Sequence, residues 1–309
     1  DKYDIKCSAN RSGTLHCAHS QNGLKDIQKR YQQLSTRGAE LELLDKQQTN
    51  QRIGSSKFFG ALFNKSAGTI NPLSYCIGLA LAAQSKGANI YETTLATKIQ
   101  SINGHWLIKT TEGSIEAKML LIATNAYQQP IKGIKSPEYT SVHYFQVATN
   151  PLPKKDTKMI LPNGEGCWDT ASVMSSFRLD EDNRLIIGGV GNLGHGASKI
   201  HTNWARRKIK SLFPNLKNIP IEYNWHGRIA MTANHIPKIQ KLGNNAYSIF
   251  GFSGRGIGPG TYFGKAVVES LLSGDENSLP VTPMSQNKER YSGIKSKLFE
   301  LGATASHLL

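Results

Sequence analysis

The chain has 309 residues, of which 39% are hydrophobic, and it carries a formal net charge of +15. No stretch approaches the ~18 consecutive apolar residues of a membrane span and no N-terminal signal peptide is visible, so we expect a cytoplasmic protein without a membrane span. Its four cysteines lack the spacing of a metal site and are expected to be free thiols: Cys7, Cys17, Cys76 and Cys167.

The basic composition makes nucleic acid a partner to consider. Lys and Arg are spread along the chain, however, and the densest cluster, residues 204–210, comes without an RNA-binding signature. A solvated basic surface is therefore the favoured interpretation, and nucleic acid is not an expected partner.

The first part of the chain alternates strands and helices. A strand is expected over 13–18, and apolar residues spaced by three and four predict an amphipathic helix over 24–34, with Gly38 as its stop signal. A strongly apolar helix is expected over 72–85, and its first residue, Pro72, sits in the first turn, where a proline is tolerated. We expect a turn and a strand to follow over 86–91.

The middle of the chain is rich in strand patterns. Asn103-Gly104 is the strongest short turn signal and predicts a hairpin between 98–102 and 105–111. The segment 117–127 contains a continuous apolar run from Met119, which predicts a strand buried on both faces, as in a parallel sheet. The strand leads into a loop over 123–127, and residues 139–190 are expected to be β-rich.

Residues 189–194 form a Gly-x-Gly-x-x-Gly run after a strand, which is formally a dinucleotide fingerprint. The next helix is expected over 198–212, with Ser198 as N-cap and His195 in the intervening loop, so it does not begin inside the glycine run. A dinucleotide fingerprint also needs an acidic residue at the end of a second strand, whereas Glu222 lies at the start of a later strand. We therefore expect no dinucleotide at this run.

The stretch from Tyr247 to Gly260 carries the pattern around which the chain is organised. β-prone residues are followed by four alternating glycines and then by apolar or small residues at helical spacing, which predicts strand, glycine-rich turn and helix. Such a helix N-terminus suits an anionic ligand atom. The same pattern also fits a turn that only packs a helix on a sheet, and the residues alone leave both interpretations open.

The run over 251–265, Gly-Phe-Ser-Gly-Arg-Gly-Ile-Gly-Pro-Gly-Thr-Tyr-Phe-Gly-Lys, resembles the C-terminal flavin-contacting segment of the D-amino-acid oxidase-like FAD-dependent oxidoreductases. It is similar above all to the γ-glutamylputrescine oxidase-like branch. The Gly-x-x-x-Pro-Leu unit from residue 68, the loop 123–127, and Phe177-Arg178 with the strand 184–189 resemble the same branch.

A second long match covers residues 221–239. Trp225, Gly227, Thr232 and Pro237 fit the family pattern of Trp-x-Gly, Thr-x-Asp and Pro. The chain departs from this pattern in two places: Asn234 replaces the usual Asp, and Lys238 falls where an apolar residue is common.

The resemblance implies an α/β fold, with an incomplete FAD-binding Rossmann-like domain interleaved with an antiparallel β-rich substrate domain. It assigns 1–67 and 139–224 to the substrate domain, 68–138 and 225–284 to the remaining part of the FAD-binding domain, and 285–309 to a C-terminal tail. The tail is expected to be a helix crossing the surface or partly loose.

The resemblance further implies FAD-dependent oxidation of a C–N bond in a small amine or amino acid. The hydride passes from the substrate carbon to the flavin, and the resulting imine hydrolyses. Related sarcosine oxidases have an oxygen-activating lysine in the substrate-side sheet. The strand 184–189 has none, so oxidase and dehydrogenase both stay open.

The resemblance also supplies candidate site residues. The catalytic candidates are His226 and Arg228, with a surface histidine and a structural arginine as the alternative. The implied cofactor-binding residues are Ala96, Thr124, Asn125, Gly227, Gly251, Ser253, Gly254, Arg255, Gly256, Ile257, Gly258, Gly260 and Thr261. A buried structural crossover remains the alternative for Ala96, and an ordinary strand end for Thr124 and Asn125. No metal site is expected.

The family opens with a Gly-x-Gly-x-x-Gly unit that holds the FAD pyrophosphate, and nothing before residue 68 matches it. We therefore expect a cleaved or engineered fragment, a truncated gene product or one subunit of a split enzyme, and weak or no FAD binding by the isolated chain. The alternative function is a non-catalytic fragment or subunit that needs another chain to hold FAD. RNA-linked amine oxidation is a third possibility, supported by net charge alone.

Overall fold

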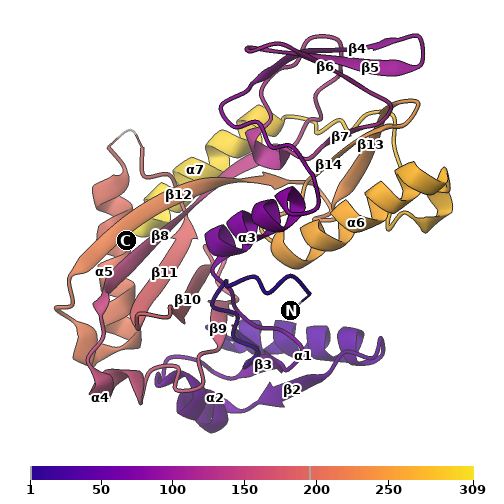
Figure 1. Ribbon diagram of the computed structural model, residues 1–309. Helices are drawn as coiled ribbons and strands as arrows, with labels where there is room; N and C mark the ends of the chain where they lie inside the picture. The colour runs from indigo at the N-terminus through magenta and orange to yellow at the C-terminus, as the bar shows by residue number, and fades with distance from the viewer. Residues whose placement is uncertain (1, 195) are drawn as a thin grey trace. The chain divides into compact units, whose positions relative to one another are not determined.

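The computed structural model describes residues 2–194 and 196–309 (Figure 1); His195, placed above in the loop before residue 198, lies outside the described residues. The chain forms two compact units. The first comprises residues up to 88, 144–227 and 301–309, and the second comprises 89–143 and 228–300. The functional division suggested by the resemblance has other boundaries and stays a prediction.

An eight-stranded sheet, in the order β12-β8-β11-β10-β9-β1-β3-β2, is the main element of the first unit (Figure 1). Its strands are β1 (Thr14–Cys17), β2 (Leu41–Leu44), β3 (Ala61–Asn64), β8 (Thr140–Pro151), β9 (Gly166–Asp169), β10 (Ser175–Leu179), β11 (Arg184–Val190) and β12 (Ile221–Met231). β1 and β9 are parallel, whereas the other neighbours from β8 to β2 are antiparallel. This sheet confirms the expected mixed α/β fold with an antiparallel-rich part.

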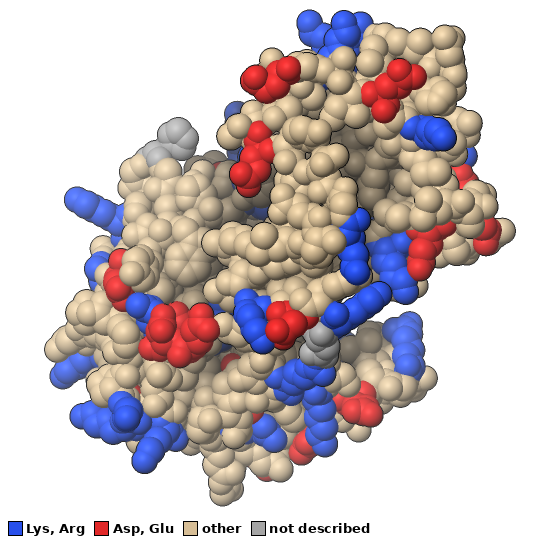
Figure 2. All heavy atoms as spheres, viewed as in Figure 1, with Lys and Arg blue, Asp and Glu red and all other residues tan. Residues whose placement is uncertain are grey.

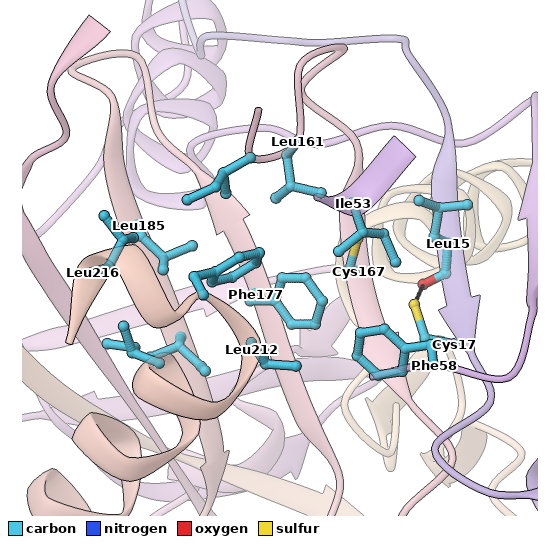
Figure 3. Packing of buried hydrophobic residues seen from close by; sticks show 14 of the residues in the cluster. Leu15, Cys17, Ile53, Phe58, Leu161, Cys167, Phe177, Leu185, Leu212 and Leu216 are labelled. Carbon is cyan, nitrogen blue, oxygen red and sulfur yellow. Dashed lines mark hydrogen bonds between the residues drawn. The ribbon is translucent and has the colours of Figure 1, made fainter. Parts of the chain in front are cut away.

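Alternation along the strands gives this sheet an apolar face and a polar face. In β1, Leu15 and Cys17 belong to the main hydrophobic core, while Thr14 and His16 point to the opposite side. Figure 3 shows the core from close by, with Phe177 among side chains from several elements; its ring stacks on that of Phe58 with 6.0 Å between centroids. Burial of one such aromatic side chain contributes about 1.5–3 kcal/mol.

Helices contribute to two hydrophobic clusters of this unit, the main core and a smaller cluster around Ile27 and Leu62. The helices of the first unit are α1 (Gln21–Ser35), α2 (Lys46–Ile53), α3 (Pro72–Gln84), α4 (Lys154–Thr157), α5 (Ser198–Leu212) and the 3₁₀ turn η2 (Pro214–Leu216). α1 confirms the amphipathic helix expected before Gly38, and Ser20 caps it by accepting a hydrogen bond from the Gly23 N–H. α2 begins with a capping box in which Asp45 and Gln48 satisfy each other's backbone N–H groups.

Helix α3 confirms the apolar helix expected over 72–85, but no residue in it is buried. Leu73 is 68% exposed and Leu81 61% exposed. A helix that is apolar on all sides is normally covered. α3 therefore presents an unusually large exposed apolar surface.

Two three-stranded sheets, β13-β14-β7 and β4-β5-β6, form the second unit. Its elements are β4 (Ala96–Ile102), β5 (His105–Thr110), β6 (Ser114–Ala117), β7 (Leu120–Ile122), η1 (Asn125–Tyr127), β13 (Lys238–Gly243), β14 (Ala246–Phe250), α6 (Ile257–Ser273) and η3 (Glu276–Ser278). α7 (Ser292–Leu308), in the segment expected as a tail, runs from this unit into the first.

Several local expectations are tested in the second unit. The hairpin is confirmed, since β4 pairs with β5 around Asn103 and Gly104, both at positive φ. β7 is parallel to β14 as expected, although of its residues only Ile122 is fully buried. The strand expected over 86–91 is wrong: residues 88–95 are irregular and mostly exposed, because they pair with no described strand.

The Gly-x-Gly-x-x-Gly run over 189–194 follows β11 and is separated from α5, which begins at Ser198. The N-cap residue is Ala197 and not Ser198, because the latter already has helical geometry. Glu222 accepts a hydrogen bond of 2.9 Å from Arg184 Nε and so has a structural partner. The run thus lacks the geometry of a dinucleotide fingerprint.

The distribution of surface charge agrees with the expected dispersed basic surface. On the face shown in Figure 2, Lys and Arg groups are interrupted by acidic and uncharged residues. Within the described residues, no helix is long and apolar enough to cross a membrane. The four cysteines are free.

Candidate functional site

The glycine-rich segment links β14 to α6 through a tight turn. Gly251, Ser253 and Gly254 have φ of +80°, +52° and +84°, so the chain passes three times through the left-handed region. A Cβ added to Gly251 would lie 2.5 Å from Thr232 Cγ2. Glycine is therefore required at position 251 both for its backbone conformation and for space.

Helix α6 begins at Ile257, and its N-cap Gly256 provides no side-chain hydrogen bond. The first N–H groups of a helix have no partner within it and carry a partial positive charge. Residues 254–259 are exposed, and a Cβ added to Gly258 or Gly260 would meet nothing within 4 Å. These donors therefore face open space instead of core, which excludes the interpretation that the turn is buried in ordinary packing.

The rest of α6 is anchored firmly. Phe263, Val267 and Leu271 are buried against β13 and β14, and the ring of Phe263 meets that of Phe252 edge-on with 5.7 Å between centroids. An anchored helix with an exposed first turn can present its N–H groups in a fixed direction.

The loop after β7 contacts the start of the glycine-rich segment. Asn125 has φ of +46°, a conformation that asparagine tolerates, and its Oδ1 accepts a 3.0 Å hydrogen bond from the Gly251 N–H. Thr124 is exposed, and its carbonyl accepts from the Tyr127 N–H. The loop 123–127 and the turn 251–254, far apart in sequence, are thus joined.

The C-terminal part of β12 completes this group of residues. The Ser253 N–H donates to the Ala230 carbonyl over 3.0 Å. The Arg228 N–H donates to Tyr127 Oη over 2.9 Å, and the guanidinium lies 4.7 Å from the centroid of the Tyr127 ring. Burial raises the pKa of nearby Tyr139, an effect that the charge of Arg228 opposes. Arg228 is thus a fixed cation beside the loop.

The structure therefore brings together many of the residues that the resemblance suggested, and leaves others apart. Asn125, Gly251, Ser253 and Arg228 belong to one connected network in the second unit. The remaining glycines, with Arg255, Ile257 and Thr261, form the exposed turn and first helical turn that follow. Ala96 lies at the start of β4 in the other sheet, and exposed His226 and half-buried Gly227 belong to the first unit.

The network fits the anionic edge of a reduced flavin. Backbone N–H donors at a helix N-terminus, glycines that leave open space and a neighbouring arginine are the donor set that stabilises developing negative charge. Gly256, Ile257 and Gly258 would supply the N–H groups. Arg255 is exposed and placed to add positive charge.

A second group of residues lies on the polar face of the eight-stranded sheet, and it includes Phe177-Arg178, which resembles the family in sequence. A cavity of about 220 Å³ lies there, entirely within the first unit. Its polar lining comes from four separate segments and consists of Thr14, Thr69, Gln146, Ser176 and Arg178, with Trp168 and Ile186 as apolar walls. The signal was available in β10, where strand alternation puts Arg178 on the side opposite to Phe177.

Three titratable groups beside this cavity are uncharged at neutral pH. Burial lowers the pKa of His16, whose ring stacks on Trp168, to about 4. Burial raises the pKa of Tyr144 well above its usual range, and its hydroxyl donates to Ser176 Oγ over 2.8 Å. Burial also raises the pKa of Cys167, so its thiol stays protonated and is a poor nucleophile.

Comparisons with known proteins show a matching family and similar curated relatives. The family model described as FAD dependent oxidoreductase matches residues 1–270. The chain is 31% identical over 241 residues to the probable oxidoreductase OrdL of Haemophilus influenzae, covering 76% of this chain and 55% of that protein. It is 29% identical over 280 residues to the gamma-glutamylputrescine oxidoreductase of Escherichia coli, covering 89% and 64%. The chain thus spans little more than half the length of the first of these relatives.

Solved structures agree at the level of the fold. L-proline dehydrogenase from P. horikoshii matches with a TM-score of 0.78 and 21% identity, over 91% of this chain and 76% of that one. Glycine oxidase from Geobacillus kaustophilus matches with a TM-score of 0.74 and 18% identity, over 88% and 73%. With the family match over most of its length and the similarity to OrdL, the chain belongs to the FAD-dependent oxidoreductases of the D-amino-acid oxidase type.

Proposed function

We propose that this protein uses FAD to oxidise a C–N bond of a small amine or amino acid. The observation that carries the proposal is the exposed N-terminal turn of α6, joined to the loop 123–127 and to β12 by hydrogen bonds. When bound, FAD supplies the capacity to accept two electrons from the substrate. The protein's own part is to position the ring and to stabilise the negative charge that develops on reduction.

Each group in the network has a distinct role in this proposal. The N–H groups of Gly256, Ile257 and Gly258 would hydrogen-bond the electron-rich edge of the ring, and the helix dipole would strengthen these bonds. Asn125 holds the turn in place through the Gly251 N–H. Arg228, held over Tyr127, supplies a positive charge beside the loop.

A charge substitution at the helix N-terminus tests this role. Ile257→Asp places a carboxylate on a side chain that is 46% exposed, next to the proposed anionic edge. The midpoint potential of bound flavin should become more negative by about 30 mV, which for a two-electron couple corresponds to about 1.4 kcal/mol. Leu272→Asp, at the 71% exposed far end of the same helix, is the matched control and should leave the potential unchanged. Equal potentials in the two variants would remove the proposed role of α6.

The substrate and the electron acceptor need separate assays. The similarity to gamma-glutamylputrescine oxidoreductase makes γ-glutamylputrescine the first amine to test. Turnover should be followed with oxygen and, in parallel, with an artificial electron acceptor. Both are needed because the residues of the strand 184–189 favour neither an oxidase nor a dehydrogenase. When FAD is held firmly, with the phosphate-binding unit proposed below added if needed, failure of every amine and amino acid to reduce the flavin anaerobically would contradict C–N oxidation.

We further propose that firm retention of FAD depends on a phosphate-binding glycine-rich unit in another segment or subunit, since no such unit precedes residue 68. Mixing the 309-residue chain with a separately expressed unit of this kind should raise flavin retention strongly. A chain that is purified yellow, with one FAD per molecule, would exclude this dependence. A cytoplasmic location is also proposed, and the four free thiols support it.

A further inference from the structure

Helix α7, drawn in yellow in Figure 1, carries a row of apolar side chains that face solvent. The members of this row are spaced by four, three, four and three residues, so the pattern repeats every seven residues. Such a repeat forms the narrow a/d seam of a coiled coil. The large members of the row are each between 59% and 67% exposed. The row consists of Ile294, Leu298, Leu301, Ala305 and Leu308.

The opposite side of α7 is small or polar, and this is the side that contacts the rest of the protein. Ala303 is buried, and Ser296 Oγ accepts a 2.9 Å hydrogen bond from the Ser141 N–H. The ring of His307 is buried and stacks on that of Trp204 with 4.2 Å between centroids. The helix is thus fixed with its apolar row outward, whereas a surface helix normally turns its apolar stripe toward the core.

An exposed apolar row of this length points to a partner, because contact with water is unfavourable for each of its large side chains. The width of the row indicates the kind of partner. Lys297 and Thr304 border it on one side, so it stays a narrow seam on that side. A narrow seam with a seven-residue repeat interlocks with another helix, whereas a flat surface is matched by a wide apolar face.

The row is self-complementary about Leu301. In an antiparallel pair of helices centred on this residue, Ile294 of one copy lies opposite Leu308 of the other, each seven residues from the centre. Leu298 then lies opposite Ala305, so that a large residue meets a small one, as interlocking side chains require. A Cβ added to neighbouring Gly302 would meet nothing within 4 Å, so the backbones have room to approach at the centre.

Charge favours the antiparallel arrangement. The N-terminal half of α7 carries Lys295 and Lys297 together with the positive end of the helix dipole, whereas residues 301–309 contain no Lys or Arg. Lys295 Nζ lies 3.7 Å from a carboxylate oxygen of Glu289, so exposed Lys297 carries most of this effect. A parallel pair would bring the two basic halves together. An antiparallel pair places each basic half beside the negative end of the other dipole.

We propose that α7 pairs with α7 of a second copy of this chain, antiparallel and with Leu301 at the two-fold axis. The same surface is used by both copies, so the contact closes as a dimer and does not propagate into a filament. This interface goes beyond the proposed oxidation and does not depend on flavin binding.

Charged residues at the axis test the proposal. Sedimentation equilibrium of the 309-residue chain over an about 100-fold range of concentration should show a monomer–dimer equilibrium with a Kd in the micromolar region. Leu301→Glu should weaken the dimer at least 10-fold, because two carboxylates would meet at the axis, and Leu301→Lys should do the same. An equimolar mixture of these two variants should dimerise again. Leu73→Glu, at a 68% exposed leucine of α3, is the matched control and should leave the dimer unchanged.

Cross-linking tests the direction of the two helices. The variants are made in a Cys76→Ser background, because Cys76 is an exposed thiol. Under mild oxidation, a mixture of Ile294→Cys and Leu308→Cys should form a disulfide-linked dimer, whereas Ile294→Cys by itself should not. Cross-linking of Ile294→Cys by itself would indicate a parallel pair and overturn the proposed arrangement.

Three other results would overturn the dimer. The first is a chain that stays monomeric over the whole range or a dimer that Leu301→Glu does not weaken. The second is a monomeric chain in which Leu301→Glu lowers the melting temperature by several degrees, since the row would then be covered within one chain. The third is a monomeric chain that binds vesicles of phosphatidylcholine and phosphatidylglycerol and loses this binding in Leu301→Glu, which would assign the row to a membrane surface.

Discussion

The side-chain carbonyl of Asn125 accepts a 3.0 Å hydrogen bond from the backbone N–H of Gly251, and this bond joins two segments 126 residues apart. It fixes the loop after β7 to the turn before α6. Both residues have positive φ, so the contact combines two conformations that few residue types adopt at low cost.

Substitution of Asn125 should separate the hydrogen bond from the backbone conformation. Asn125→Gly keeps the left-handed conformation and loses only the bond, at a cost of about 1 kcal/mol. Asn125→Ala loses the bond and also places a residue in the left-handed region that tolerates it less well than asparagine or glycine, so it should cost roughly 1 kcal/mol more. Urea unfolding of both variants measures this difference. Equal stabilities would mean that the conformation at position 125 carries no strain.

Gly251→Ala should be strongly destabilising, by about 2 kcal/mol or more, because it combines positive φ with a contact of 2.5 Å to Thr232 Cγ2. Gly258→Ala is the matched control. It lies in α6 with nothing within 4 Å, so it should stabilise the protein by about 0.5–1 kcal/mol through helix propensity. Thermal unfolding compares the two, and a tolerated Gly251→Ala would show that the turn is more adaptable than its geometry indicates.

Asp169 holds the turn that leads into β10 and so positions Arg178. Its carboxylate is buried and accepts hydrogen bonds from Ser175 Oγ at 2.5 Å and from Lys208 Nζ at 2.9 Å. Asp169→Ala should cost about 3–5 kcal/mol, because it leaves a partly buried ammonium group without its partner. Asp169→Asn keeps an acceptor and should cost less. A loss below 1 kcal/mol for Asp169→Ala in urea unfolding would contradict this role.

Acid should destabilise the first unit through two buried histidines. Burial lowers the pKa of His16 and of His307 from 6.5 to about 4. Between pH 6.5 and pH 4 the unfolded chain binds protons that the folded chain does not, so stability falls as the pH falls through this window. Each histidine contributes a loss of up to about 3 kcal/mol near pH 4.

His16→Phe isolates one of these two contributions. Phenylalanine preserves a ring against Trp168 and removes the Nδ1 atom that lacks a partner among the described residues. Melting temperatures measured from pH 7.5 to pH 4.5 should therefore fall less steeply in this variant. Identical slopes for the variant and the natural protein would show that His16 does not titrate in this window.

The sequence by itself determined the local elements that have local causes. The Asn103-Gly104 hairpin follows from the positive φ that two-residue turns require, and the α1 helix follows from the spacing of its apolar residues. The pattern that begins at Tyr247 and continues past Gly260 indicated a strand, a turn and a helix, and the glycine-rich motif within it indicated the family. The expected strand over 86–91 failed because strand formation depends on a partner elsewhere in the chain, which periodicity does not show.

Only the tertiary structure decided which distant residues meet. The bond from Gly251 to Asn125, and the cavity that collects Thr14, Gln146 and Arg178 from separate strands, depend on sheet order and register. No local pattern encodes these, because register is set by the packing of whole strands on a shared core. For the same reason the sequence marks Arg178 as part of a family-like motif, but only the fold shows that it lies at the wall of this cavity.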